Sequence, residues 1–527
     1  MDNNSRPMSV WLTCVAVMAV LGAALGGQVT GGSISGAHRP ATGATTAAGS
    51  AQTKSRITGI SVLGSQSFGK FNTVPYARTW GTVAGVVAPG ENVHGLEALD
   101  HDADRNYQYT AEFEMIAPEK RGTNPVIVVE AENRGSPVLL AALHDTAAVG
   151  PPSSVMYPSG LGNGFLFEHA TSYARVQWQY GFAAGVPKNA EGVGEVIIRD
   201  FGRLLAGRTK VEPKPSFDFG TYRALILGGI SQSGFFVNTF IAEGFNADPL
   251  TGHPVFDGAI AVDGVGTWLA LNQLAAENGS NEYPYVLPNG KPLAPTELLK
   301  RPQSDPFYVD IANYTDFYRL RASVTDAAER PERMRRYDWP SPHARASGGG
   351  GGNRASKCND GVPVDLNTIS YTPYLRAVVL GLERTLGVAS AKNGAGLPPS
   401  TVFKLGPAPS DTLHFNPLPG ITVEVPVTDK DDQPIGGARF PEVIHPTGRP
   451  VPVSLSPTVT TSINETCGNL GGWQPFTTAQ LAKRYRNQSN YINLYRASLD
   501  ELIAGGYLLA SDGDEMLKAA ASRYANP

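Results

Sequence analysis

The sequence predicts an α/β fold built around a mainly parallel β-sheet. From about residue 121 onward, short apolar runs typical of buried parallel strands alternate with segments of helical periodicity. One such run, at 223–228, is followed by a tight Gly- and Ser-rich turn at 229–234 and then by a helical pattern at 235–243. With 41% hydrophobic and 17% charged residues, the chain also has the composition of a globular protein with a sizeable core.

The turn at 229–234 reads Gly-Ile-Ser-Gln-Ser-Gly and places Ser231 between a strand and a helix. This arrangement is the nucleophile elbow of α/β-hydrolases, in which small flanking residues, here Gly229 and Ser233, let strand and helix approach closely. Similar letters around Ser33 lie in a low-complexity tail, and those around Ser65 lie in a strand-like region with no helix after it. We therefore expect Ser231 to be a nucleophile on an α/β-hydrolase fold.

The remaining elements follow from periodicity and from Gly and Pro, which number 59 and 41. An N-terminal β region is predicted from strands at 56–63, 78–87 and 107–116. Strands of the main sheet are predicted at 125–130, 174–178, 223–228, 258–262, 306–311 and, more weakly, 333–338. Helices are predicted at 191–205, 235–243 and 374–386, followed by a Pro-rich, strand-like region at 400–470 and helices over 477–527.

The domain organisation follows from shifts in composition. Residues 10–25 are almost unbroken apolar, are preceded by Arg6 and end near a small-x-small site, which predicts a cleaved signal peptide at 1–26 and a secreted or periplasmic protein. An uncleaved N-terminal anchor is the alternative. Residues 27–55 form a low-complexity linker. The α/β-hydrolase domain then spans 56–400, with a cap insertion at about 264–304, and a C-terminal extension at 401–527 packs on the same domain.

Cysteine usage and charge bear on compartment and partners. Cys14 leaves with the signal peptide, so Cys358 and Cys467 are expected to form one disulfide closing a loop of about 110 residues, although two separate buried thiols would give the same count. The net charge of −4 gives no reason to expect nucleic acid or an anionic membrane as partner. No Cys/His spacing suggests zinc, so no metal or organic cofactor is predicted.

An activated serine needs a general base, which in α/β-hydrolases follows the acid along the chain. That order leaves His253, His343, His414 and His445 as candidates. His253 comes before the strand at 258–262, and His414 and His445 lie beyond the helix that closes the α/β unit. His343 follows the last predicted strand and is therefore favoured.

The acid that orients the histidine should follow the strand at 306–311. Asp316 lies just beyond that strand and is favoured over Asp310, Asp326 and Asp263. A loop cap or an ion pair with Arg319 would be a purely structural role for Asp316.

The oxyanion hole needs two backbone N–H groups directed at the developing charge. One is expected from Gln232, directly after the nucleophile, and the other from the loop after 125–130, which contains Asn133, Arg134 and Gly135. Arg134 could instead bind a substrate carboxylate or be solvated.

Several blocks of the chain resemble the large bacterial and fungal family of alpha/beta hydrolase domain-containing proteins, from about residue 56 to the end. These blocks are 132–135, 163–169, 178, 231–234, 244–246, 255–258, 315–318, 374–377, 398–400 and 471–476. The resemblance implies a triad role for Ser231, Asp316 and His343. Similar elbows occur in glucuronoyl esterases and tannase-like esterases, which implies bulky extracellular esters as substrates.

The sequence thus predicts a secreted serine hydrolase that cleaves carboxylic esters, either small molecules or esters linked to polysaccharide, with no stable membrane partner after signal cleavage. Lactones and amides use the same machinery. The alternative is a non-catalytic extracellular protein on the same scaffold, with aromatic groups near Trp268 or Trp473 holding a glycan or another ligand.

Overall fold

The chain divides into residues 1–49 and 50–527, and every residue described below belongs to the second unit. The computed structural model describes residues 54–120, 123–146, 162–187, 190, 192–212, 217–265, 294–320, 322–325, 329–343, 354–355, 364–389, 394–408, 423–451 and 468–526. The predicted signal peptide, most of the linker, most of the cap insertion, Cys358 and Cys467 lie outside these ranges. None of the helices within them is long and apolar enough to cross a membrane.

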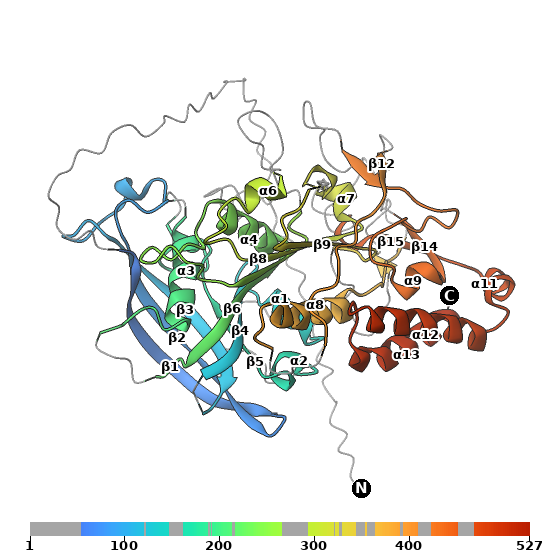
Figure 1. Ribbon diagram of the computed structural model, residues 1–527, viewed down its shortest axis with the longest axis horizontal. Helices are drawn as coiled ribbons and strands as arrows, with labels where there is room; N and C mark the ends of the chain where they lie inside the picture. Colours follow the sequence, from blue (N-terminus) through green and yellow to red (C-terminus); the bar gives the residue numbers. More distant parts are fainter. Residues whose placement is uncertain are drawn as a thin grey trace, which may run out of the picture. The chain divides into compact units, whose positions relative to one another are not determined.

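A nine-stranded sheet in the order β1-β2-β3-β5-β4-β6-β7-β8-β9 organises the described chain (Figure 1). The strands are β1 (Arg56–Phe71), β2 (Val74–Val87), β3 (Tyr107–Pro118), β4 (Thr123–Ala131), β5 (Thr171–Val176), β6 (Thr221–Ile230), β7 (Gly258–Val262), β8 (Phe307–Asn313) and β9 (Met334–Trp339). Pairing is antiparallel from β1 to β5 and parallel from β5 through β4 to β9. The predicted α/β-hydrolase fold with a mainly parallel sheet is confirmed, and the N-terminal strands continue that sheet as its antiparallel edge.

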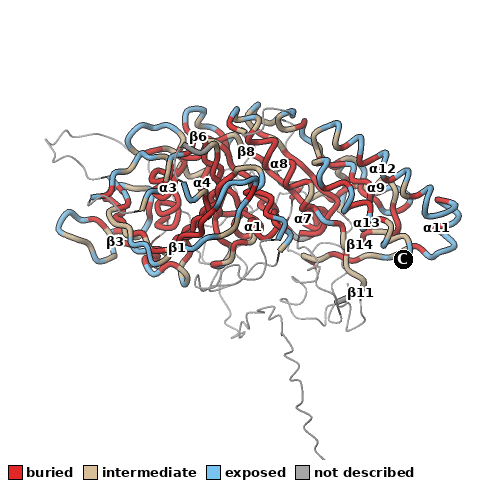
Figure 2. The backbone as a smooth tube through the Cα atoms, turned by 90° about the horizontal axis from the view of Figure 1, so that it is seen from below, coloured by how far each residue is buried: buried red, intermediate tan, exposed pale blue. Residues whose placement is uncertain are grey.

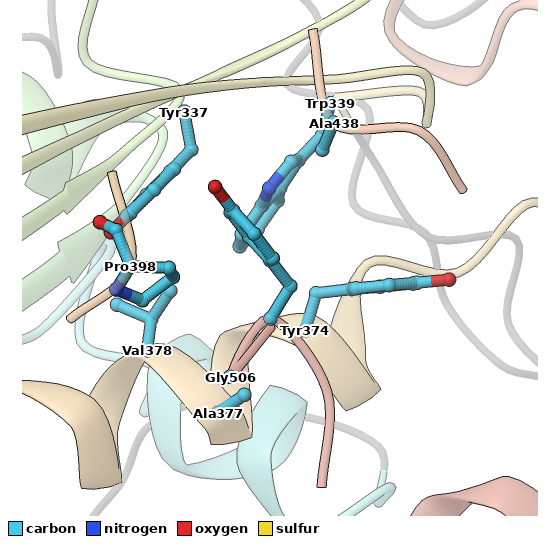
Figure 3. A pocket seen from close by; sticks show the side chains of 9 residues that line it. Tyr337, Trp339, Tyr374, Ala377, Val378, Pro398, Ala438 and Gly506 are labelled. Carbon is cyan, nitrogen blue, oxygen red and sulfur yellow. The ribbon is translucent and has the colours of Figure 1, made fainter. Parts of the chain in front are cut away.

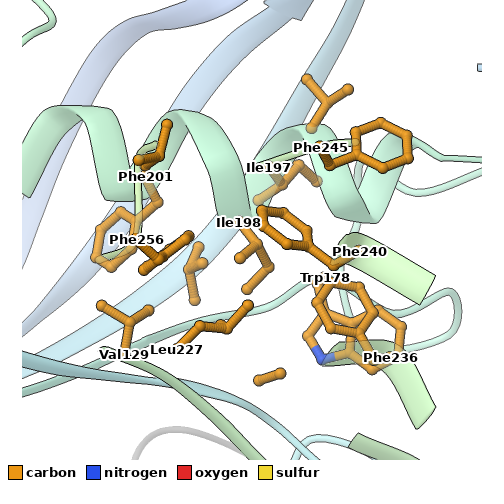
Figure 4. Packing of buried hydrophobic residues seen from close by; sticks show 14 of the residues in the cluster. Val129, Trp178, Ile197, Ile198, Phe201, Leu227, Phe236, Phe240, Phe245 and Phe256 are labelled. Atoms are coloured by element: carbon orange, nitrogen blue, oxygen red, sulfur yellow. The ribbon is translucent and has the colours of Figure 1, made fainter. Parts of the chain in front are cut away.

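Alternating side chains of the central strands enter two apolar clusters, because successive residues of a strand point to opposite faces. In β4, Ile127 and Val129 belong to one cluster, whereas Val126 and Val128 belong to the other. The first cluster contains α3 (Val193–Leu205) and α4 (Gln232–Ala242). Figure 4 shows side chains of these two helices packed over Val129 of β4 and Leu227 of β6.

The second cluster covers the opposite face of the sheet with α1 (Val138–Leu143), α2 (Phe165–Glu168) and α8 (Thr372–Thr385). Figure 2 shows that buried residues are concentrated in β6, β8, α4 and α8, in the interior of this layered arrangement. Helices α3, α4 and α8 lie close to their predicted positions. Helices α1 and α2 were not predicted, since six and four residues are too short to show a helical period.

Smaller elements complete the described chain. The remaining helices are α6 (Pro295–Leu298), α7 (Asp316–Arg319), α9 (Pro441–Ile444), α11 (Thr478–Tyr485), α12 (Gln488–Ala504) and α13 (Gly513–Ala525), with 3-10 turns η1 (Leu96–Ala98), η2 (Ala322–Thr325) and η3 (Ala510–Asp512). Short strand pairs are β10 (Arg354–Ala355) with β11 (Val364–Asp365), β12 (Leu405–Pro407) with β13 (Glu424–Pro426), and β14 (Gly448–Val451) with β15 (Gly472–Pro475).

Residues of the C-terminal helices belong to the same apolar cluster as α8. An aromatic-lined pocket lies where β9, α8 and the loop after α12 meet (Figure 3). The hydroxyls of Tyr337 and Tyr507 donate to the carbonyls of Pro398 and Pro399, at 2.7 Å and 3.1 Å. With these hydroxyls engaged by the backbone, the pocket is a packing seam between the sheet and the C-terminal extension.

One buried arginine links this extension to the rest of the fold. Arg376 of α8 donates through Nε to the carbonyl of Leu143 at 2.8 Å, and its guanidinium pairs with Asp145, just after α1, and with Asp512 of η3. Three segments far apart in the sequence therefore meet at one guanidinium.

Candidate active site

Ser231 stands at the turn between β6 and α4 in a conformation that L-residues rarely adopt, with φ 61° and ψ −124°. A Cβ on Gly229 would lie 2.8 Å from the Cβ of Ser233, so glycine is required where strand and helix come together. The Ser231 N–H donates to the Val262 carbonyl of the neighbouring strand at 2.9 Å. The turn thus holds the Ser231 side chain, which is half-buried, at the carboxyl end of the sheet.

Ser231, His343 and Asp316 form a continuous series of contacts. The Oγ of Ser231 lies 2.8 Å from Nε2 of His343, and Nδ1 of the same ring lies 2.7 Å from Oδ1 of Asp316. His343 and Asp316 are both buried. These distances fall within hydrogen-bond range, so the structure brings together the three residues favoured for the triad.

Neighbouring strand ends explain why these side chains meet. Strands β6, β7, β8 and β9 are parallel, so their carboxyl ends lie at one edge of the sheet. Asp316 follows β8, and its Oδ2 accepts from the Asn313 N–H at 2.8 Å. His343 follows β9, and its N–H donates to Oγ1 of Thr315 at 2.8 Å. Both members are therefore fixed by the residues at the end of β8.

The other histidine candidates lie elsewhere. His253 is exposed in the loop before β7. His445 follows α9, and its Nε2 lies 3.0 Å from Oγ of Ser498 on α12. His414 lies outside the described residues.

Two of the other acid candidates are also placed. Asp310, within β8, pairs with Arg336 of β9 at 2.6 Å. Asp263, directly after β7, has Oδ2 3.9 Å from Nδ1 of His343. Asp326 lies outside the described residues.

The loop after β4 corrects one expectation for the oxyanion hole. The N–H of Asn133 donates to the Ser136 carbonyl at 2.9 Å, and the Ser136 N–H donates back at 3.0 Å. Arg134 and Gly135, with φ 49° and 75°, form the two central positions of this tight turn. The backbone of Asn133 is thus used within its own turn and is wrongly assigned as a donor to the oxyanion. Its side-chain amide instead donates to the Ile230 carbonyl at 3.0 Å, which ties the turn to the elbow.

Buried ionic groups lie next to that turn. Arg175 pairs with Glu114 at 2.7 Å and with Glu132, whose carbonyl accepts from the Trp178 indole at 2.9 Å. The carboxylate of Glu130 accepts from the N–H groups of Leu139 and Leu140 at the start of α1. Burial raises the pKa of Glu130 to about 7, against the effect of these hydrogen bonds. None of these contacts is local in sequence, and sequence reasoning missed them.

The side chains at this edge of the sheet include residue types that can bind a metal ion. Among the described residues, one group of His, Cys, Asp and Glu side chains has its ligand atoms mutually within 4.8 Å, and it consists of Asp263, Asp316 and His343. Nδ1 of His343 is in hydrogen-bond contact with Asp316, and Asp316 also accepts from Asn313. These contacts suit the orientation of an imidazole whose Nε2 faces Ser231.

Solved structures similar to this chain have low sequence identity to it. A CE15 glucuronoyl esterase from Teredinibacter turnerae T7901 is 10% identical over 40% of this chain and 49% of that chain, with a TM-score of 0.21. Prolyl oligopeptidase B from Galerina marginata is 12% identical over 49% of this chain and 37% of that chain, with a TM-score of 0.24. A glucuronoyl esterase from Solibacter usitatus is 11% identical over 43% of this chain and 55% of that chain, with a TM-score of 0.22.

The chain therefore spans between 37% and 55% of the length of these three proteins. No curated protein matches the sequence. The family described as "Alpha/beta hydrolase domain" matches residues 167–518, which is more than half of the chain and includes Ser231, Asp316 and His343. The protein belongs to this alpha/beta hydrolase domain family.

Proposed function

We propose that the protein is a secreted serine hydrolase that cleaves carboxylic esters through an acyl-enzyme. The observation that carries the proposal is the strained Ser231 with its Oγ 2.8 Å from Nε2 of His343, whose other nitrogen lies 2.7 Å from Asp316. A nucleophile, a base in contact with it and a group that orients the base are the parts that acyl transfer requires.

In this proposal Ser231 is the nucleophile and His343 the general base. Asp316 accepts the Nδ1–H of His343 and so leaves the lone pair on Nε2 facing the serine hydroxyl. As the bond from Oγ to the acyl carbon forms, the serine proton passes to Nε2. The same proton then goes to the departing alkoxide. Water attacks the acyl-enzyme in the second half, with His343 again taking and returning a proton.

The oxyanion is held by backbone N–H groups on both sides of the elbow. The N–H of Gln232 lies in the first turn of α4, where N–H groups have no partner within the helix. Arg134 and Gly135 supply the other side, from the turn that Asn133 ties to Ile230. Arg134 is exposed and its guanidinium donates to Oδ1 of Asn133 at 3.1 Å, so an anionic group on the substrate would meet a cation at the turn that is tied to the elbow.

A fluorophosphonate probe tests the proposal, since it reacts with activated serines. Intact-mass measurement should show one covalent adduct on the wild-type protein and none on Ser231→Ala. Aryl, sugar and uronate esters, with matched lactones and amides, then define the bond that is cleaved. Secretion is tested by N-terminal sequencing of protein recovered outside the cytoplasm, with cleavage expected near residue 26.

Absence of labelling in both proteins would contradict the catalytic proposal. It would favour the alternative, a non-catalytic binding protein. Glycan binding that is weakened by Trp473→Ala would then support this alternative.

A further inference from the structure

A second buried carboxylate faces the same nitrogen of His343 as Asp316 does. Asp263 follows β7 directly, and Asp316 follows the adjacent parallel strand β8, so their side chains reach the imidazole from neighbouring strand ends. Oδ2 of Asp263 lies 3.9 Å from Nδ1, and Oδ1 of Asp316 lies 2.7 Å from it. Both carboxylates are fully buried.

The backbone holds Asp263 in place. Its φ is 57°, in the left-handed region that aspartate tolerates better than most side chains, and its N–H donates to the Ile311 carbonyl at 2.8 Å. The next residue, Gly264, accepts at its carbonyl from Nδ2 of Asn238 on α4 at 2.8 Å. The direction of this carboxylate is therefore set by β8 on one side and α4 on the other.

Asn313 connects the two carboxylates. Its backbone N–H donates to Oδ2 of Asp316 at 2.8 Å, and its side-chain amide donates to Oδ1 of Asp263. The remaining oxygen of that amide accepts from the hydroxyl of Ser341. Both carboxylates thus have one oxygen held by Asn313, while the other oxygen of each is directed to His343.

Other charged groups on the surrounding strands are engaged with each other. Arg336 of β9 pairs with Asp310 of β8 and with Asp338, at 2.6 Å in each case. Tyr308 of β8 donates to Asn238 on α4 and to Asp310. Tyr318 of α7 bonds Tyr314 at 3.1 Å. The described charged groups within ion-pair distance of the His343 ring are Asp263 and Asp316.

We propose that Asp263 is a second carboxylate partner of His343, one that stabilises the imidazolium formed during acyl transfer and takes over its orientation when Asp316 is neutralised. The inference rests on the proposed function. In the step concerned, the Oγ–carbon bond forms, the carbonyl π pair moves to the carbonyl oxygen and the serine proton moves to Nε2. The ring becomes positive while two carboxylates face its Nδ1. Asp263 neither gains nor loses a proton, so it is a positioning residue.

Four variants test this role: Asp263→Asn, Asp316→Asn, the double variant, and Asp257→Asn as the matched control. Asparagine keeps the size of the side chain and tolerates the left-handed backbone at 263. Asp257 precedes β7 and accepts from the Leu225 N–H at 3.0 Å, so it offers the same charge change at the opposite end of the strand that leads to Asp263.

The measurement is the rate of fluorophosphonate labelling between pH 5 and 9. Asp263→Asn should slow labelling about tenfold and move the acid limb of the profile to lower pH, because the protonated ring loses one of two negative neighbours. In the Asp316→Asn background the same substitution should slow labelling about 100-fold, since no carboxylate then faces Nδ1. Asp257→Asn should match the wild type.

The inference would be overturned if Asp263→Asn slowed labelling by the same factor in the wild-type and Asp316→Asn proteins and the acid limb did not move. The proposed function would remain intact. Labelling that depends on an added divalent cation, and is lost with EDTA, would also overturn it, because the three side chains would then be metal ligands.

An activity-independent readout separates the two proposals. In protein carrying isotope-labelled histidine, the His343 signals are assigned by their loss in His343→Gln. Their titration midpoint should move to lower pH in Asp263→Asn but not in Asp257→Asn. If the wild-type protein is not labelled by the probe yet this shift is observed, the proposed function fails and the electrostatic pairing stands. An unchanged midpoint contradicts the pairing itself.

Discussion

Replacing Ser231 by glycine should abolish acyl transfer and leave the protein more stable than replacing it by alanine. The residue has φ 61° and ψ −124°, and a non-glycine residue in such a region costs about 1–3 kcal/mol. Glycine removes that cost but loses about 0.5–1 kcal/mol through the greater freedom of the unfolded chain. Subtraction leaves glycine ahead of a residue with a Cβ by about 1 kcal/mol in the free energy of unfolding at the centre of these ranges, and by about 2.5 kcal/mol at most.

Ser231→Ala is the matched comparison, because it also lacks Oγ and its contact with His343 but keeps the Cβ. Unfolding entropy of about 2.1 cal/mol/K per residue gives roughly 1 kcal/mol/K for a unit of this size, so the central gain corresponds to a difference in Tm of about 1 °C between the two variants. Calorimetry and the urea midpoint should both rank Ser231→Gly above Ser231→Ala. An alanine variant as stable as the glycine variant would refute the assignment of strain to this residue.

Three further outcomes are expected. Asn133→Ala removes the hydrogen bond to the Ile230 carbonyl and should slow labelling about tenfold, because the oxyanion turn is then held less firmly. Tm should stay within about 2 °C of the wild type, and an unchanged labelling rate would show that this hydrogen bond is not needed. Burial raises the pKa of Glu383 from 4.5 to about 7, so between these pH values the folded state holds a proton that the unfolded state has lost. The free energy of unfolding therefore falls by about 3 kcal/mol as pH rises through this range. Between pH 4.5 and 7.5 the wild type should therefore lose about 3 kcal/mol of unfolding free energy that Glu383→Gln keeps, as measured by urea unfolding at both pH values. An equal change with pH in the two proteins would contradict this. Arg376→Met leaves buried Asp512 without its cation and should cost about 3–5 kcal/mol in urea unfolding, whereas a loss below about 1 kcal/mol would mean that water replaces the guanidinium.

The parts of the fold that were predictable from sequence depend on neighbouring residues. The elbow at Ser231 was recognisable because the strand, turn and helix that define it are contiguous. Chain order then favoured Asp316 and His343, since parallel strands bring their carboxyl ends to one edge, where the structure also brings these two side chains together.

Contacts between distant segments left no local signal. The bond from Asn133 to Ile230 joins residues 97 positions apart, and nothing in the sequence of the loop distinguishes that role from donation to an oxyanion. From the sequence, Asp263 is only an alternative to Asp316, because the shared contact with Nδ1 depends on the register of β7 against β8. The strand predicted at 174–178 is β5 at Thr171–Val176, since Trp178 turns away to bond Glu132 and pack against Phe236.

The guanidinium of Arg376 has a consequence for the order in which the chain can fold as it is synthesised. Its partner Asp512 lies 136 residues further along, which at about 5–20 residues per second takes the ribosome roughly 7–27 s to add. Throughout that interval α8 carries a cation that lacks one of its two carboxylates, so docking α8 against α1 would bury an incompletely neutralised charge. Ser231, Asp316 and His343 all emerge before that point. A nascent chain therefore exposes Ser231, Asp316 and His343 before α8 can dock with all of its partners, and the synthesis of Asp512 sets the earliest time at which this packing is complete.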